Sequence, residues 1–128
     1  MNKFTIAIII VIAAFFAFKF FATSKENFNE ITAIELKEAQ KNNEKFLLVD
    51  VREASERAVN KIKNSEHLKL GKIRKEFQKT FPNVKKDDKI ILYCRSGRRS
   101  ETAALMLQDQ GYTNVHSLKG GIIKYLSK

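Results

Sequence analysis

The fold of this 128-residue chain is decided by the segment Lys89-Ile90-Ile91-Leu92-Tyr93-Cys94-Arg95-Ser96-Gly97-Arg98-Arg99-Ser100. Its first part is a continuous apolar run, which predicts a strand covered on both faces of a parallel sheet. A turn containing Gly97 follows, and a helix is predicted from about Arg99 to Gln110, where Gly111 suits the position just past a helix end. A buried strand that ends in a tight turn and leads into a helix is typical of an open α/β sheet.

The alternation of strand and helix continues on both sides of this segment. Upstream, the apolar run 46–49 ends at Asp50 and predicts a second buried strand, and downstream 115–118 predicts the last one. Thr32, with Glu35 three residues later, is typical of a helix start. Further helices are predicted near 53–59, from about 72 to 80 and after Gly120-Gly121, and a short strand is predicted at Leu68 and Leu70. The sequence therefore predicts one small α/β domain over 30–128, with a mainly parallel sheet flanked by helices.

A long apolar run at the N-terminus stands apart from this pattern. From Phe4 to Ala22, 17 of 19 residues are apolar. As a helix, these residues would measure about 28 Å, close to the roughly 30 Å thickness of the hydrocarbon core. We therefore expect 1–22 to be a transmembrane anchor or a signal sequence that meets the membrane through 4–22, and 23–29 to be a polar linker. Phe20-Phe21-Ala22 lacks the paired small residues of a signal peptidase site, which favours an uncleaved anchor.

The charges beside this run give opposing signals for its orientation. Lys3 and the amino terminus lie on one side, and Lys19 and Lys25 lie on the other. The very short charged tail favours a cytoplasmic N-terminus. We therefore predict a single-pass protein of the cytoplasmic membrane with its domain on the periplasmic or outer side, the alternative being a cleaved, secreted form.

The composition excludes several classes of protein. One cysteine cannot build a disulfide scaffold or a metal site of several thiolates. The net charge is +10. In 23–128, however, 22 basic residues are interspersed with 14 acidic ones, leaving +8 without a basic block. This pattern predicts a solvated surface and no nucleic-acid partner.

Cys94 is the candidate nucleophile. It lies at the carboxyl end of a predicted strand, directly before a helix, where open α/β sheets bind ligands. Helix N-terminal amides and nearby guanidinium groups would lower the pKa of the thiol. The same amides can receive an anion. The candidate substrate-binding residues are Arg95, Ser96, Gly97, Arg98, Arg99 and Ser100.

Residues 94–100 resemble the active-site loop of the rhodanese-like sulfurtransferases. Leu48-Val49-Asp50-Val51-Arg52-Glu53 is similar to the family's strand with its Asp-x-Arg element, and Lys119-Gly120-Gly121-Ile122 is similar to its Gly-Gly turn. The resemblance covers 29–127. It departs at Asn60-Lys61-Ile62-Lys63-Asn64-Ser65, where the family usually has Gly-His-Ile-x-Gly-Ala, and at Tyr125, where Trp is common.

The resemblance implies transfer of sulfur in two steps. The Cys94 thiolate attacks the outer sulfur of thiosulfate or a similar small anionic donor, forms a persulfide and releases sulfite. Cyanide, a thiol or a protein acceptor then takes the sulfur. Arg99 is the first candidate for contact with the anion, and Asp50 and Arg52 are expected to pair and support the loop. Neither a metal nor an organic cofactor is required.

Two alternatives remain. Cysteine phosphatases carry His-Cys, five residues and then Arg. Here Tyr93 precedes Cys94, and Arg99 follows after only four residues. The second alternative is a membrane-tethered persulfide carrier or sensor with little turnover, whose sequence would look the same as that of an enzyme.

Overall fold

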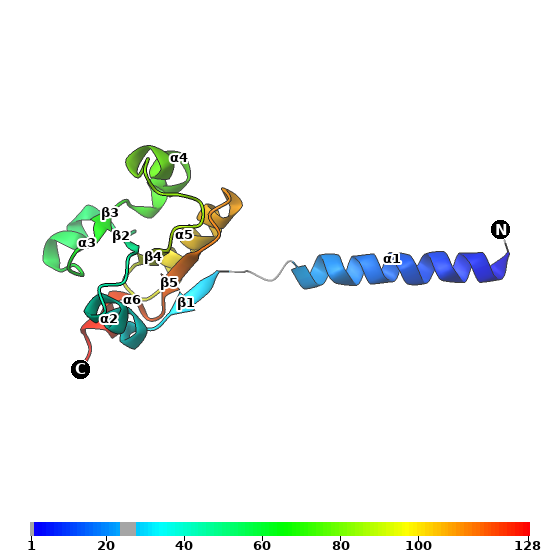
Figure 1. Ribbon diagram of the computed structural model, residues 1–128, viewed down its shortest axis with the longest axis horizontal. Helices are drawn as coiled ribbons and strands as arrows, with labels where there is room; N and C mark the ends of the chain where they lie inside the picture. Colours follow the sequence, from blue (N-terminus) through cyan, green and yellow to red (C-terminus); the bar gives the residue numbers. More distant parts are fainter. Residues whose placement is uncertain (1, 24–27) are drawn as a thin grey trace.

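A five-stranded sheet forms the centre of the domain (Figure 1). The computed structural model describes residues 2–23 and 28–128, with the side chains of 2–18 and 28–128. The strands lie in the order β1-β5-β4-β2-β3 and every neighbouring pair is parallel, which confirms the predicted parallel sheet. The strands are β1 (Asn29–Ile31), β2 (Leu47–Asp50), β3 (Glu66–His67), β4 (Ile90–Tyr93) and β5 (Val115–Leu118).

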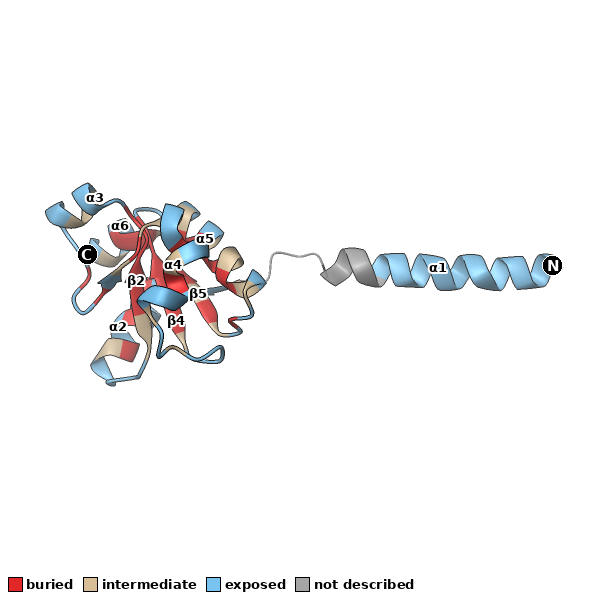
Figure 2. Ribbon diagram, turned by 90° about the horizontal axis from the view of Figure 1, so that it is seen from above, coloured by how far each residue is buried: buried red, intermediate tan, exposed pale blue. Residues whose placement is uncertain are grey.

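Helices cover both faces of the sheet, so the strands form the buried centre in Figure 2. The helices are α1 (Lys3–Thr23), α2 (Ala33–Lys41), α3 (Ala54–Val59), α4 (Leu70–Thr80), α5 (Arg98–Asp109) and α6 (Gly121–Leu126). The helices α4 and α5 contribute to one core cluster and α2 and α6 to the other. This two-sided burial confirms the interpretation of the apolar runs in β2 and β4.

The alternation of side chains along β4 divides the core. Ile90 and Leu92 face the cluster that contains Phe77 of α4, whereas Ile91 and Tyr93 face the cluster that contains Leu36 of α2. All six side chains are fully buried. Because successive residues of a strand point to opposite faces, β4 needs an apolar residue at every position.

The strand order places a crevice at the carboxyl ends of β2 and β4. From β2 the chain passes through α3 to β3, at one edge of the sheet, and from β4 it passes through α5 to β5, towards the other edge. Neighbouring parallel strands whose connections leave in opposite directions form the usual ligand crevice of an open α/β sheet. Asp50 ends β2 and Cys94 follows β4, so both lie at this crevice.

Two short strands differ from the prediction. β1 begins at Asn29, inside the expected linker, and pairs with β5, while Phe28 packs against the core. The short strand predicted at Leu68 and Leu70 is wrong: β3 is Glu66–His67, and Leu70 already begins α4. Such short strands are set by pairing with a neighbour, because two or three residues carry too little periodicity to reveal them.

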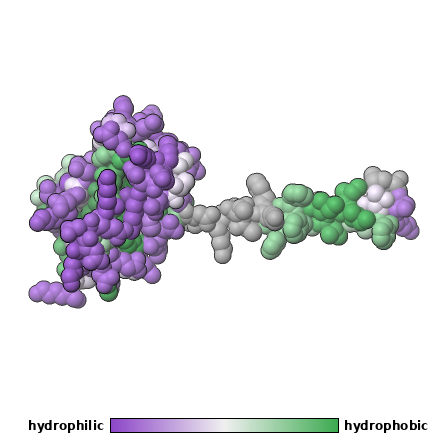
Figure 3. All heavy atoms as spheres, viewed as in Figure 1, coloured by the Kyte–Doolittle hydropathy of each residue, from purple (hydrophilic) through white to green (hydrophobic). Residues whose placement is uncertain are grey.

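The apolar N-terminal run forms the 21-residue helix α1. Its described side chains are exposed and form the apolar rod in Figure 3. Within the ranges that the structure describes, no helix is long and apolar enough to cross a membrane. The transmembrane helix expected over 4–22 is therefore not confirmed. Lys25, one of the charges beside the apolar run that bear on its orientation, lies outside the described residues.

Candidate active site

Cys94 lies directly after β4 and only 1% of its surface is exposed. The loop that follows turns at Gly97, whose φ of +115° lies in the region that favours glycine. From there α5 begins at Arg98, so its first amides point back towards the cysteine. The structure thus places Cys94 at the N-terminus of a 12-residue helix, as the sequence predicts.

The Cys94 sulfur is held by groups of its own loop. The amide of Gly97 donates to Sγ at 3.1 Å. The Ser100 hydroxyl oxygen lies 3.6 Å from Sγ and accepts from the thiol. When the thiol loses its proton, the same hydroxyl can donate to the thiolate, because a hydroxyl both donates and accepts. The site therefore supports both protonation states of the sulfur.

The pKa of Cys94 reflects a balance between burial and hydrogen bonding. Burial alone would raise the pKa of the thiol, because it disfavours the thiolate. The amide and hydroxyl of Ser100, followed by the amides of Gly97 and Ser96, more than offset burial and lower the pKa below its ordinary value. A larger fraction of Cys94 is therefore thiolate, the nucleophilic form, at neutral pH.

Ser100 is itself fixed by two further oxygen atoms. Its hydroxyl donates to the Gly97 carbonyl oxygen at 3.0 Å and lies 2.7 Å from the Ser117 hydroxyl of β5. Ser100 and Ser117 are both buried. The loop is therefore tied to the neighbouring strand through a chain of hydroxyl groups.

The Gly120-Gly121 turn supports the loop from behind. The amide of Ile122 donates to the Cys94 carbonyl oxygen at 2.9 Å, and the amide of Ile123 donates to that of Arg95 at 3.2 Å. Gly121 has a φ of +60°, and a Cβ atom there would overlap the Arg95 carbonyl group. The absence of a side chain at Gly121 thus allows the backbone of α6 to approach the cysteine loop closely.

Asp50 and Arg52 pair as expected at the carboxyl end of β2. The Arg52 guanidinium donates to both Asp50 oxygens, at 3.0 Å and 2.9 Å, and also to Asn60. Both side chains are buried. Burial raises the pKa of Asp50, but hydrogen bonds from the side chain and the amide of Arg52 outweigh burial and lower that pKa overall. The pair is consistent with a supporting role.

The segment that departs from the family pattern is held by the same network. Arg57 donates to Asp50 and to the hydroxyl and carbonyl oxygens of Ser65. The Tyr93 hydroxyl accepts from the Ile62 amide at 3.2 Å and lies 2.9 Å from the Ser65 hydroxyl. Residues 60–65 are thus fixed from both ends without the glycines of the usual family sequence.

The three arginines of the loop differ in their surroundings. Arg95 and Arg98 are exposed and have no carboxylate partner among the described residues. Arg99, the first candidate for anion contact, instead gives two hydrogen bonds to Glu56 of α3, at 2.7 Å and 2.8 Å. Hydrogen bonding to Arg99 lowers the pKa of Glu56 to about 2, and Glu56 in turn raises the pKa of Arg99. Arg99 is therefore already hydrogen-bonded to Glu56 when no anion is bound.

Glu56, Arg57 and Ser117 are residues of this site that sequence reasoning missed. Glu56 accepts from the Glu53 amide at the start of α3, so helix-start spacing could have marked it as a capping residue but not as the partner of Arg99. Ser117 is a buried polar residue within a short strand. As for a metal, no group of three or more His, Cys, Asp and Glu residues suited to bind one occurs among 2–23 and 28–128.

The sequence is similar to those of rhodanese-like proteins and sulfurtransferases. The family model of the rhodanese-like domain matches residues 32–128. A sulfurtransferase of Allochromatium vinosum is 36% identical over 97 residues, which cover 76% of this chain and 87% of that protein. A putative mitochondrial thiosulfate sulfurtransferase of Schizosaccharomyces pombe is 37% identical over 91 residues. That match spans 64% of this chain and 64% of the yeast protein.

Solved structures show the same arrangement of strands and helices. The crystal structure of a rhodanese-related protein from Thermoplasma volcanium matches with a TM-score of 0.66 and 27% identity. The match covers 77% of this chain and 91% of the archaeal one. The shared part corresponds in extent to the α/β domain.

Proposed function

Because the chain belongs to the family of rhodanese-like domains, we propose that it is a sulfurtransferase in which Cys94 carries the sulfur as a persulfide. The donor is thiosulfate or a similar small anion, and the acceptor is cyanide, a thiol or a protein thiol. The observation that carries this proposal is that the buried Cys94 sulfur accepts a hydrogen bond from the Gly97 amide at the N-terminus of α5.

The first step forms the persulfide. The Cys94 thiolate attacks the outer sulfur of thiosulfate, and a new S–S bond forms as the S–S bond of thiosulfate breaks. Sulfite leaves with the electron pair of that bond, and the persulfide keeps one negative charge. The lowered pKa of Cys94 favours this step, because only the thiolate is an effective nucleophile.

The loop is suited to stabilise the charge that this step creates. The amides of Ser96, Gly97 and Ser100 contribute to the lowered pKa of Cys94, and the amide of Gly97 donates to the sulfur at 3.1 Å. Fixed amides that face a developing negative charge stabilise it without reorganisation. The exposed guanidinium groups of Arg95 and Arg98 are placed to attract the donor anion.

The second step returns the enzyme to its starting state. Cyanide attacks the outer sulfur of the persulfide, and thiocyanate forms as the S–S bond to Cys94 breaks. The electron pair of that bond stays on Cys94 as the thiolate. A thiol acceptor follows the same course and becomes a persulfide itself.

Intact mass spectrometry of the full chain tests the proposal. We expect thiosulfate to add the mass of one sulfur atom, cyanide to remove it, and Cys94→Ser to abolish the change. Repeated cycles should release thiocyanate in excess over protein. An unchanged mass with thiosulfate and with a polysulfide donor would contradict the proposal and direct attention to the phosphatase alternative.

A persulfide carrier is the second candidate, and one observation favours it. Cys94 is 99% buried, which limits the approach of an acceptor to the bound sulfur. A carrier would load one sulfur per chain and discharge it to a specific partner, with little turnover towards cyanide. The ratio of thiocyanate released to sulfur loaded separates the two candidates.

The location of the domain is a further part of this proposal. We propose that the apolar run 4–22 holds the protein at the cytoplasmic membrane with its domain on the outer side. The support is the composition of the run, with 17 apolar residues among 19. Membrane fractionation, followed by protease treatment of intact and lysed cells, tests both statements. A full-length chain found only in the soluble fraction would contradict them.

A further inference from the structure

We propose that Glu56 determines donor specificity by competing with dianionic donors for Arg99. The inference rests on the proposed sulfur transfer at Cys94. It follows from the position of the Glu56–Arg99 ion pair, which links the two helices on either side of the crevice. Glu56 belongs to α3, which follows β2, and Arg99 belongs to α5, which follows β4.

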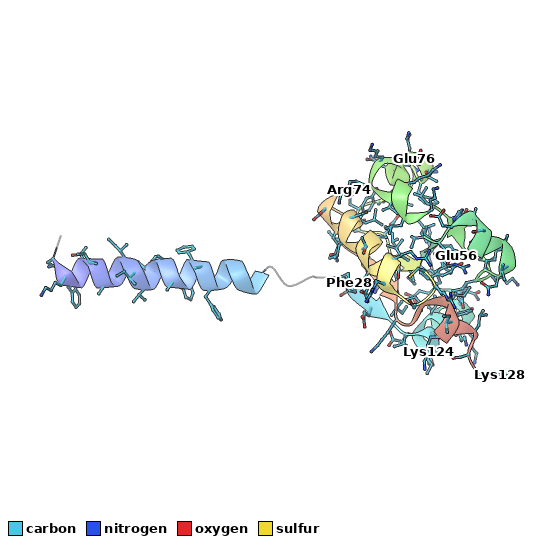
Figure 4. The ribbon with its side chains drawn as sticks, turned by 180° about the vertical axis from the view of Figure 1, so that it is seen from behind. Phe28, Glu56, Arg74, Glu76, Lys124 and Lys128 are labelled. Atoms are coloured by element: carbon cyan, nitrogen blue, oxygen red, sulfur yellow. The ribbon has the colours of Figure 1, made fainter. Side chains whose placement is uncertain are left out.

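The contact between Glu56 and Arg99 is close and directional. Nη1 of Arg99 donates to one Glu56 oxygen at 2.7 Å and Nη2 donates to the other at 2.8 Å. This two-bond pairing uses the face with which a guanidinium group also binds an oxyanion. An anionic donor therefore has to displace the Glu56 carboxylate before it can use the same face of Arg99. In Figure 4, Glu56 lies on the side of α3 that faces the start of α5.

Arg99 is also within electrostatic range of the reacting sulfur. The charge of Cys94 contributes to the raised pKa of Arg99. Glu56 thus already neutralises the positive charge of Arg99. Of the three arginines of the loop, Arg95 and Arg98 are exposed and have no ion pair among the described residues. Such a site disfavours a dianion such as thiosulfate more than a donor with one negative charge.

The side chains of the pair are placed so that exchange is feasible. Arg99 is 35% exposed and Glu56 is 29% exposed, so solvent reaches both. Ion pairs at such partly exposed positions are much weaker than buried ones. A donor can therefore displace Glu56 from Arg99. Because breaking this ion pair weakens the binding of the donor, the KM for the donor is higher.

Glu56→Gln tests the proposal in the full-length chain. The variant removes the competing charge, and its amide oxygen can still accept a hydrogen bond from the backbone amide of Glu53 at the start of α3. We expect the KM for thiosulfate to fall about two- to fivefold, with kcat nearly unchanged. The KM for the persulfide of a small neutral thiol, which carries at most one charge, should change by less than half as much.

Glu53→Gln is the matched control. It removes the same charge three residues away, where the 61% exposed side chain of Glu53 has, among the described residues, one ion pair, a 3.7 Å contact with Lys69. An equal fall in KM in both variants would show a general effect of net charge and overturn the inference. An unchanged or higher KM for thiosulfate in Glu56→Gln would overturn it as well.

A double variant tests whether the fall in the KM for thiosulfate depends on Arg99. In an Arg99→Gln background, Glu56→Gln should no longer lower the KM, because the group for which it competes is absent. A fall of the same size in that background would contradict the inference. Should Glu56→Gln fail to fold, Glu56→Asp, whose shorter side chain weakens the two-bond contact while keeping the charge, should give a smaller fall in KM.

The mass measurement separates this inference from the proposed function. If the unsubstituted chain gains no sulfur from either donor, the proposed transfer at Cys94 fails. If it gains sulfur through Cys94 and the KM does not depend on Glu56, the transfer stands and only the role of Glu56 fails.

Discussion

The backbone of Gly121 lies so close to the carbonyl group of Arg95 that a single additional carbon on Gly121 would overlap it. This approach brings the first turn of α6 against the cysteine loop, where the amides of Ile122 and Ile123 bind two carbonyl oxygens. The conformation of the loop that carries Cys94 thus depends on a residue 27 positions later in the chain.

Gly121→Ala should destabilise the domain by about 2–4 kcal/mol. The φ of +60° disfavours any residue with a Cβ atom, and the overlap involves backbone atoms that have little freedom to move. Urea unfolding followed by circular dichroism measures the change. Gly71→Ala is the control, because a Cβ atom there meets nothing within 4 Å and Gly71 lies within α4. Alanine in a helix should instead stabilise by about 0.5–1 kcal/mol, and equal effects of the two substitutions would contradict the argument.

Ser100→Ala should raise the pKa of Cys94. The Ser100 hydroxyl group lies near the sulfur and helps to lower the pKa of Cys94. Without it, a smaller part of the rise in pKa caused by burial is compensated. The pH dependence of alkylation by iodoacetamide reports the fraction of thiolate. We expect the midpoint of the unsubstituted chain to reflect a pKa below the ordinary thiol value and that of Ser100→Ala to lie at higher pH. Thr102→Ala removes an exposed hydroxyl from the same helix and should leave the midpoint unchanged. Equal midpoints in all three proteins would contradict the assigned role of Ser100.

The sequence was sufficient to predict the parts of the fold that depend on local pattern. The apolar runs of β2 and β4, the cap at Thr32 and the helix after Cys94 all appear as expected. Each of these has a signal within about ten residues, either a continuous buried run or a capping residue. The position of Cys94 at the start of α5 followed from the same local signals.

The parts that were missed depend on contacts between distant segments. β1 exists because Asn29, Glu30 and Ile31 pair with β5, almost ninety positions later. The pairing of Arg99 with Glu56 spans 43 positions, and nothing near Arg99 distinguishes a free guanidinium group from an engaged one. Sequence alone therefore identified the cysteine loop but not which of its arginines remains available.

Asp50→Asn should cost about 3–5 kcal/mol of stability. Asp50 receives hydrogen bonds from Arg52 and Arg57, and the Arg52 side chain is only 4% exposed. The substitution leaves a buried guanidinium group without its counter-charge, which is far more costly than the loss of a surface ion pair. Urea unfolding at pH 7 measures the difference. Glu44→Gln breaks the more exposed pair with Lys89 and should cost at most about 1 kcal/mol. A cost below about 1 kcal/mol for Asp50→Asn would contradict the assigned role of the network.

The stability of the domain should fall as the pH decreases below about 5. The pKa of Glu56 is lowered to about 2 in the folded chain, and that of Asp50 is lowered as well. In the unfolded chain both carboxyl groups titrate near their ordinary values of about 4. Between these values the unfolded state binds more protons than the folded state, so acid favours unfolding. The contribution of Glu56 is therefore complete above about pH 5 and is lost as the pH falls towards 2.

Glu56→Gln isolates one part of this acid sensitivity. The variant cannot be protonated at position 56, so its free energy of unfolding should depend less steeply on pH between about 5 and 2.5 than that of the unsubstituted chain. Glu53→Gln is the charge-matched control and should retain the acid sensitivity that Glu56 contributes, because it leaves the Glu56–Arg99 ion pair in place. Chemical unfolding at pH 6, 4 and 3 compares the three proteins. If Glu56→Gln is as acid-sensitive as the unsubstituted chain, the ion pair with Arg99 does not hold in solution, and the specificity argument built on it loses its structural basis.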